Sequence, residues 1–119
     1  MRGEILSESE LSFAKIVWDT APLSSGKLVQ LCNEQLGWKK PTTYTMLRNL
    51  CQAGFFQNVD ATVSVLITEE QYLANESSDI VNKHFNGSIS KFVTAFAGKT
   101  KLDKRQIEEL RRFIEECDD

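Results

Sequence analysis

Apolar residues recur at helical spacing early in the chain, after a polar start that is typical of a helix cap. Ser7 and Glu10 stand three residues apart, so each side chain can accept a hydrogen bond from the other residue's amide. The predicted apolar face of this helix consists of Leu11, Ala14, Ile16, Val17 and Trp18. Pro22 disfavours helical geometry at the residue before it, so we expect the helix to end near Thr20.

A second helix is predicted between a serine cap and a glycine stop. Ser24 or Ser25 can cap its start, and Gly37 can end it in a left-handed conformation. Its apolar residues are Leu28, Val29, Leu31, Cys32 and Leu36. Only residues 38–40 separate it from the next helix, so the two form a helix-turn-helix pair.

The third helix has two faces of different chemistry. It is predicted to begin at Pro41, whose missing N–H costs nothing in a first turn, and to end before Gly54. Thr43, Met46, Leu47 and Leu50 share one side, and Pro41, Tyr44, Thr45 and Arg48 share the other. One face therefore packs, and the other is free to contact a partner such as the major groove of DNA.

The pattern becomes extended after Gly54. Residues 55–59 and 62–67 carry aromatic and β-branched side chains, and Asp60-Ala61 separates the two runs. We predict a short β-hairpin, which after a helix-turn-helix pair is the wing of a winged helix.

From Thr68 onward the pattern is helical, with breaks at residues 86–87 and 98–100 and a new cap at Asp103. These helices are too short and too few to cover one another's apolar faces, so we predict that a second copy covers them in a homodimer. The predicted dimerisation residues are Ile80, Val81, Phe85, Ile89, Phe92, Val93, Phe96, Ile107, Leu110, Phe113 and Ile114.

The pattern as a whole predicts a mainly α-helical fold with a small β-hairpin. A winged helix-turn-helix domain that binds DNA would occupy residues 1–72, and a helical dimerisation region would occupy residues 73–119. The length of 119 residues fits one small domain with a helical appendage.

Composition and charge narrow the function classes. The net charge of −3 argues against bulk attraction to nucleic acid, so any affinity for DNA must be local. The apolar runs fall far short of the roughly 20 residues that a membrane span needs, and the N-terminus lacks the order of a signal peptide. The three cysteines form no C-x-x-C motif, which favours reduced thiols. We therefore expect a cytoplasmic protein without a membrane partner.

The sequence predicts no catalytic residue, metal site or cofactor. His84 has no Cys, His or carboxylate pair at ligand spacing, and no Gly-rich phosphate loop or nucleophile elbow occurs. Trp18 and Trp38 border apolar helical faces, which favours the core over a ligand site.

Three stretches occur in an order that is typical of one family. They are residues 6–10 followed by Lys15-Ile16-Val17-Trp18, the Thr-rich helix between Trp38 and Gly54-Phe55, and residues 107–111. Together they resemble the penicillinase and methicillin-resistance repressors, a winged-helix family that also includes copper-responsive repressors. The resemblance implies a dimeric bacterial transcriptional repressor that binds a palindromic operator and joins its protomers through C-terminal helices.

The chain also departs from this family. Family members that respond to β-lactams are cleaved by a protease before a Phe. The matching bond here is Ala95–Phe96, in which Ala95 stands where the family's cleaved bond has Asn. Whether a regulatory protease is a partner of this chain therefore stays open. Copper-responsive members carry paired C-x-C motifs, whereas only Cys117 stands near this C-terminus, which argues against copper sensing. The wing has no cation and contains Asp60, so we expect it to add little to phosphate binding.

We expect the DNA contacts to gather around the third helix. Arg48 is assigned to a guanine edge or a phosphate, and Tyr44 and Thr45 to bases or methyl groups. Lys39 and Lys40 are assigned to phosphates, together with amides at the helix start. The predicted DNA-binding residues are Lys39, Lys40, Thr42, Tyr44, Thr45, Arg48, Ser25 and Lys27.

Other interpretations stay open. The cations can instead belong to an ordinary solvated surface, and Tyr44 can instead pack against the domain. The neutral wing and the negative net charge also fit a winged helix repurposed as a protein-interaction module, an antirepressor or a scaffold, with weak or no DNA binding.

Overall fold

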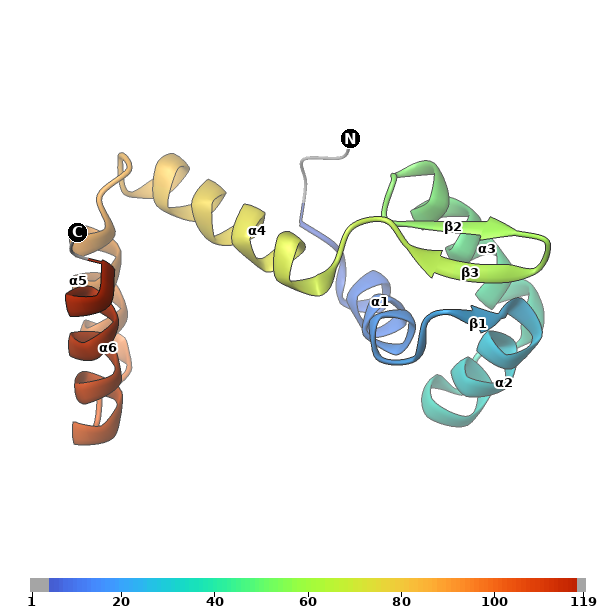
Figure 1. Ribbon diagram of the computed structural model, residues 1–119, viewed down its shortest axis with the longest axis horizontal. Helices are drawn as coiled ribbons and strands as arrows, with labels where there is room; N and C mark the ends of the chain where they lie inside the picture. The colour runs from blue at the N-terminus through green and yellow to red at the C-terminus, as the bar shows by residue number, and fades with distance from the viewer. Residues whose placement is uncertain (1–4, 118–119) are drawn as a thin grey trace. The chain divides into compact units, whose positions relative to one another are not determined.

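The computed structural model describes residues 5–117, in which the chain forms two compact units (Figure 1). The first unit extends to Glu76, and the second begins at Ser77. In chain order the elements are α1 (Glu8–Thr20), β1 (Leu23–Ser24), α2 (Ser25–Leu36), α3 (Lys40–Gln52), β2 (Phe56–Val59), β3 (Thr62–Val65), α4 (Glu69–His84), α5 (Ile89–Lys99) and α6 (Lys104–Cys117). The predicted fold class is confirmed, but α4 crosses the division between the units, so the functional boundary at residues 72/73 stays a prediction.

Local capping determines where the first helices begin. The Ser7 amide donates to Glu10 Oε1 at 2.8 Å, and the Glu10 amide donates to Ser7 Oγ at 3.2 Å, which confirms the predicted reciprocal cap. Ser24, and not Ser25, caps α2 by accepting from the Lys27 amide at 3.0 Å. Each of these bonds satisfies an amide that the helix itself leaves without a partner.

A three-stranded antiparallel sheet completes the first unit, with strand order β1-β3-β2. Strands β2 and β3 form the predicted hairpin, with Phe56 opposite Val65, although both strands are shorter than predicted. Strand β1 pairs with β3 and places Leu23 opposite Val63. No pattern in the sequence predicted β1, because two residues are too few to show the alternation of a strand.

Left-handed backbone positions shape the turns around α2 and the hairpin. Gly37 ends α2 with a φ of 70°, as predicted. Asp60 and Ala61 have φ angles of 52° and 59°, which match a two-residue turn of the primed type. The Ser25 amide donates to the Ala61 carbonyl at 2.9 Å, so the tip of the wing is tied to the start of α2.

Side chains from the three N-terminal helices and the sheet form one apolar core. Phe13 is 0% exposed; its ring stacks on Trp38 with centroids 6.0 Å apart and meets Phe56 edge-on at 6.3 Å. Trp18 is partly buried and donates from Nε1 to the Ile67 carbonyl at 2.9 Å. Both Trp side chains therefore pack against the core as predicted, but the predicted face of α1 omitted Phe13, one of its most buried residues.

The second unit contains the end of α4 together with α5 and α6. Asn86 and Gly87, with φ angles of 51° and 76°, make the predicted break between α4 and α5. Phe92 meets Phe85 edge-on at 5.6 Å and stacks on Phe96 at 6.4 Å. No residue of α5 or α6 is buried, so these aromatic contacts do not amount to a closed core. Among residues 5–117, no helix is both long and apolar enough to cross a membrane.

Candidate nucleic-acid interface

Helix α3 buries one side and exposes the other. Its buried side chains are Thr43, Leu47 and Leu50, all of which belong to the predicted packing face. By its position in the helical turn, Thr45 lies opposite this buried stripe, and Thr42 and Arg48 are exposed beside it. The helix therefore presents hydroxyl groups and a guanidinium to solvent from a firmly packed base.

The start of α3 has no side-chain cap. Its N-cap residue, Lys39, makes no such bond, whereas Ser7 and Ser24 cap α1 and α2. The helix begins at Lys40, one residue before the predicted start, so Pro41 occupies the second position. Uncapped amides and the helix dipole favour an anion at this end, and two exposed lysines add positive charge there.

Tyr44 joins α3 to α2. Its hydroxyl donates to Ser25 Oγ at 3.3 Å, and Ser25 is only 6% exposed. Lys40 Nζ lies 6.0 Å from the centre of the Tyr44 ring, at the outer limit of a cation–π contact. The interpretation in which Tyr44 packs against the domain therefore agrees with the structure. A DNA contact through either hydroxyl would compete with the hydrogen bond between Tyr44 and Ser25. The DNA contacts assigned to these two residues stay predictions.

Two grooves flank the exposed face of α3. One, of about 400 Å³, is lined by Tyr44, Leu47, Arg48, Cys51 and Asn58. The other, of about 290 Å³, is lined by Pro41, Thr42, Thr45, Met46 and Asn49. The grooves thus gather four of the predicted DNA-binding residues along one helix and add side chains that the sequence interpretation did not include.

Asn49 and Asn58 are the two polar side chains that the sequence interpretation missed. Asn49 is exposed four residues after Thr45, so helical spacing alone could have identified it. Asn58 belongs to β2, and it reaches the groove beside Arg48 only because the hairpin folds back against α3. No local sequence pattern could have shown that contact.

The thiols and carboxylates give this region no further charge or metal chemistry. Burial raises the pKa of the Cys51 thiol, so at neutral pH the thiol is uncharged and Arg48 supplies the charge of their shared groove. Burial also raises the pKa of the Cys32 thiol. Within the described part of the chain, no cluster of three His, Cys, Asp or Glu side chains could hold a metal ion.

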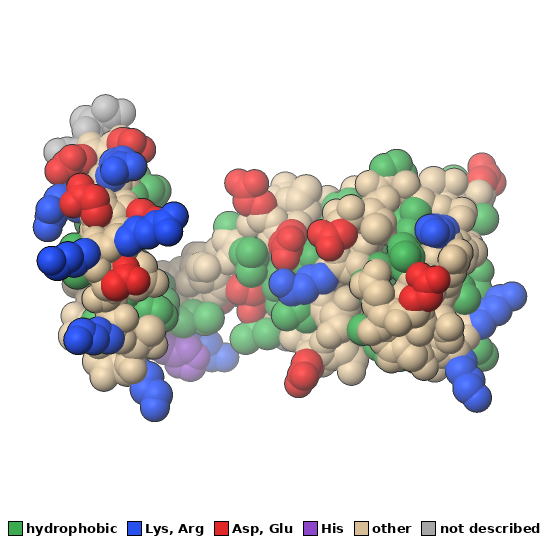
Figure 2. Space-filling model, turned by 90° about the horizontal axis from the view of Figure 1, so that it is seen from below, with side chains coloured by type: hydrophobic (Ala, Val, Ile, Leu, Met, Phe, Trp, Pro, Cys, Tyr) green, Lys and Arg blue, Asp and Glu red, His purple; other side chains and the backbone are tan. Residues whose placement is uncertain are grey.

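Positive charge in the first unit is sparse and local. On the face shown in Figure 2, its Lys and Arg side chains stand apart from one another. Lys27 is exposed at the start of α2. The wing carries exposed Gln57 and Asn58 along β2 and exposed Asp60 at its turn, so it offers no cation to a phosphate.

The predicted dimerisation residues all belong to the second unit. Ile80, Val81, Phe85, Phe92 and Val93 are half-buried, and Ile89, Phe96, Ile107, Leu110, Phe113 and Ile114 are exposed. The Ala95–Phe96 bond lies inside α5. Large apolar side chains exposed together on neighbouring helices are typical of a surface that binds another protein.

Comparison with known proteins gives a consistent result. Residues 6–116 match the family model described as penicillinase repressor. The penicillinase repressor of Bacillus licheniformis is 25% identical over 115 residues, which cover 93% of this chain and 90% of that protein. The methicillin resistance regulatory protein MecI of Staphylococcus aureus strain Mu50 is 26% identical over 113 residues, and MecI of Mammaliicoccus sciuri is 25% identical over the same length. Both MecI alignments cover 92% of this chain and 92% of the relative.

Proposed function

Because the chain belongs to the penicillinase repressor family, whose members are transcriptional repressors and not enzymes, we propose that it represses as a homodimer on a palindromic DNA operator. Helix α3 would read the DNA, and the second unit would join the protomers. The observation that carries the proposal is the exposed hydroxyl and guanidinium face of α3, which stands on a buried apolar base next to an uncapped, lysine-flanked helix start. The family assignment favours this role over a protein-interaction module.

The start of α3 would hold the phosphate backbone. Lys39 and Lys40 provide two cations beside the uncapped amides, which suits a phosphate that sets the position of the helix in the groove. Lys27, at the start of α2, would add a second phosphate contact. Ser25 would act through Tyr44, whose ring it holds against α2, in addition to any phosphate contact of its own.

The exposed face of α3 would contact the bases. Arg48 can form paired hydrogen bonds with a guanine edge, and Thr42 and Thr45 can contact thymine methyl groups or base edges. Asn49 lies in the groove that these threonines line, and its amide can pair with an adenine edge. Tyr44 would contribute its ring edge to a base or a methyl group while its hydroxyl stays on Ser25.

Affinity would depend on symmetry more than on charge. The wing has no cation and the net charge is −3, so each protomer can neutralise few phosphates. Few phosphate contacts give a shallow dependence of affinity on salt. Two half-sites read by one dimer raise the affinity, because the second contact is made at a high effective concentration.

A selection from random double-stranded DNA tests the proposed function directly. We expect the protein to enrich a two-fold symmetric site at low salt. Failure to enrich any sequence would contradict DNA reading, and an asymmetric site would contradict the dimeric arrangement. Sedimentation of the free protein at micromolar concentration checks the homodimer separately, because a monomer there would contradict that part alone.

A further inference from the structure

Asn58 stands on the core-facing side of β2, yet its side chain is exposed. Side chains alternate between the two faces of a strand, so Asn58 shares its face with Phe56, which is 1% exposed. Its partner in the antiparallel register is Val63, which is 0% exposed. An apolar residue here could extend the core, but the strand carries an amide. Within residues 5–117, no hydrogen bond or ion pair uses that amide, so its donors are free for a partner.

The groove of about 400 Å³ that contains Asn58 runs along one side of α3. The helix contributes Tyr44, Leu47, Arg48 and Cys51, which recur at helical spacing, and β2 contributes Asn58. Leu47 is 2% exposed and the Cys51 thiol is uncharged, so both offer an apolar surface. Arg48 and Asn58 are exposed donors beside this surface. The combination suits a ligand that carries an apolar sugar next to an anionic group.

The diameter of α3 determines which part of DNA would meet this groove. An α-helix with its side chains is about 10–12 Å across, and the major groove is about 12 Å wide, so a helix fills it from wall to wall. The walls are the two sugar–phosphate strands. Strand β2 packs against α3 (Figure 1), so a β2 side chain beside the helix would lie at a wall and not over the bases.

We propose that the groove between α3 and β2 seats the sugar–phosphate backbone of one DNA strand, with the Asn58 amide donating to a phosphate oxygen. This inference rests on the proposed function and assigns the wing a neutral contact in place of a cation. The deoxyribose would pack on Leu47 and Cys51, while Arg48 reaches past the backbone to a base edge. Asp60 follows two residues later and its charge would repel the backbone, so the contact depends on the hydrogen bond and not on charge neutralisation.

Removing the amide tests the contact. We expect Asn58→Ala to weaken binding about fivefold, and by the same factor on the selected site and on a duplex of scrambled sequence, because a phosphate carries no sequence information. Fluorescence anisotropy at low salt measures both affinities. Gln57→Ala is the matched control, because Gln57 carries the same amide on the opposite face of β2 and should bind as the native chain does. The free energy of unfolding should be unchanged in both variants, since both side chains are exposed.

The dependence of affinity on salt provides a second readout. A neutral amide releases no counterion, so Asn58→Ala should leave the slope of log affinity against log salt unchanged. Asn58→Lys places a cation on the same phosphate, and we expect tighter binding at low salt and a slope steeper by about 0.9. An unchanged slope in Asn58→Lys would contradict a phosphate at this position.

The outcomes separate this inference from the proposed function. Loss of affinity on the selected site alone would make Asn58 a base contact and overturn the backbone assignment. Equal binding by Asn58→Ala and Gln57→Ala, in a protein whose affinity still falls in Arg48→Ala, would overturn the inference and leave the proposed function intact. A native chain that binds no duplex at low salt would refute both.

Discussion

The two units of this chain bury their apolar side chains to very different extents. In the first unit, Phe13 and Phe56 lie in a closed core. In the second unit, α5 and α6 have no buried residue, and Phe113 is 63% exposed. The first unit therefore has the contacts it needs within one chain, whereas the second has an apolar surface that suits a partner. The difference agrees with the proposed roles, in which the first unit reads DNA and the second unit joins the protomers.

The largest effect on stability should come from a cavity in the core of the first unit. Phe13→Ala removes a ring that contacts both Trp38 and Phe56, so we expect it to lower the free energy of unfolding of the first unit by about 3–5 kcal/mol. Denaturant unfolding followed by Trp fluorescence measures this loss. Phe113→Ala is the matched control, because its exposed ring should leave that transition in place. Equal losses in both variants would contradict the contrast between the units.

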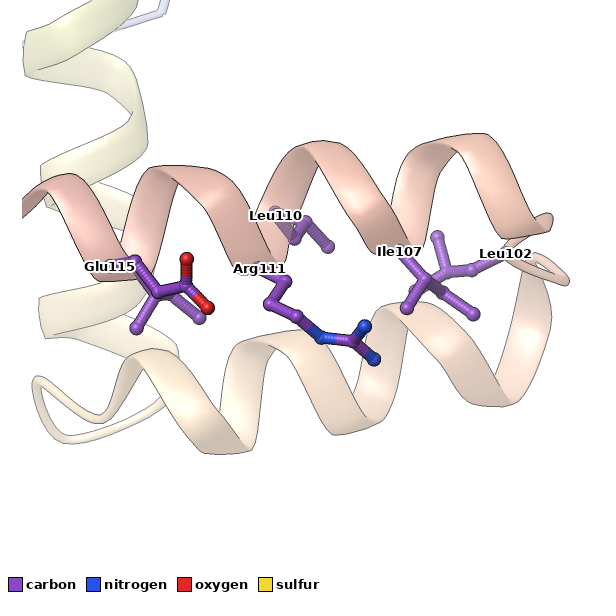
Figure 3. A pocket seen from close by; sticks show the side chains of 6 residues that line it. Leu102, Ile107, Leu110, Arg111 and Glu115 are labelled. Carbon is purple, nitrogen blue, oxygen red and sulfur yellow. The ribbon is translucent and has the colours of Figure 1, made fainter.

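A charge among the exposed apolar side chains of α6 should weaken dimerisation and leave the folding of the first unit unchanged. Leu110→Glu would bury a carboxylate at the proposed interface, so we expect the dimer dissociation constant to rise roughly 30-fold or more. Sedimentation equilibrium measures the dissociation constant. The control is Arg112→Glu, which changes a charge on the same helix but lies outside the groove that Leu110 lines with Leu102, Ile107, Arg111, Ile114 and Glu115 (Figure 3). Unfolding of the first unit should be unchanged in both variants. A dimer that tolerates Leu110→Glu would place the interface elsewhere.

On the DNA-reading side, Arg48→Ala should lower the affinity for the selected site about tenfold, because a guanidinium contact to a base is worth about 1–3 kcal/mol. Fluorescence anisotropy with labelled duplex provides the measurement. Lys15→Ala removes a cation that pairs with Glu69 at 3.5 Å and serves as the charge-matched control. If the two variants bind equally, Arg48 is not part of the interface.

The smallest effect concerns the bond between α3 and α2. Tyr44→Phe removes the hydroxyl that donates to Ser25 Oγ, and we expect a loss of about 0.5–1.5 kcal/mol in unfolding free energy. A double-mutant cycle with Ser25→Ala isolates the contribution of the bond. Additive losses in the cycle would show that the two side chains do not interact.

The sequence predicted best what depends on near neighbours in the chain. The cap at Ser7 involves residues three apart, and the left-handed stop at Gly37 needs only its own backbone, so both appear in the local pattern. The packing face of α3 was also predicted, because helical spacing identifies which side chains share a side. The start of α3 was misplaced by a single residue.

Features that depend on distant contacts were missed. Strand β1 exists because Leu23 meets Val63, forty residues later in the chain, and its own two residues carry no periodicity. Asn58 enters the groove beside Arg48 only after the hairpin has folded back. The bond between Tyr44 and Ser25 likewise joins two helices whose angle the sequence does not encode locally.

The central claim is that the chain binds DNA as a symmetric pair, and the stoichiometry of the complex tests it most directly. Native mass spectrometry of the protein with its selected site, and with a duplex that keeps one half-site, counts the chains on each DNA. We predict two chains on the full site and binding to the half-site duplex that is weaker by at least about tenfold, because only one recognition helix of the dimer is engaged there. A single chain on the full site, bound as tightly as to the half-site, would contradict the account.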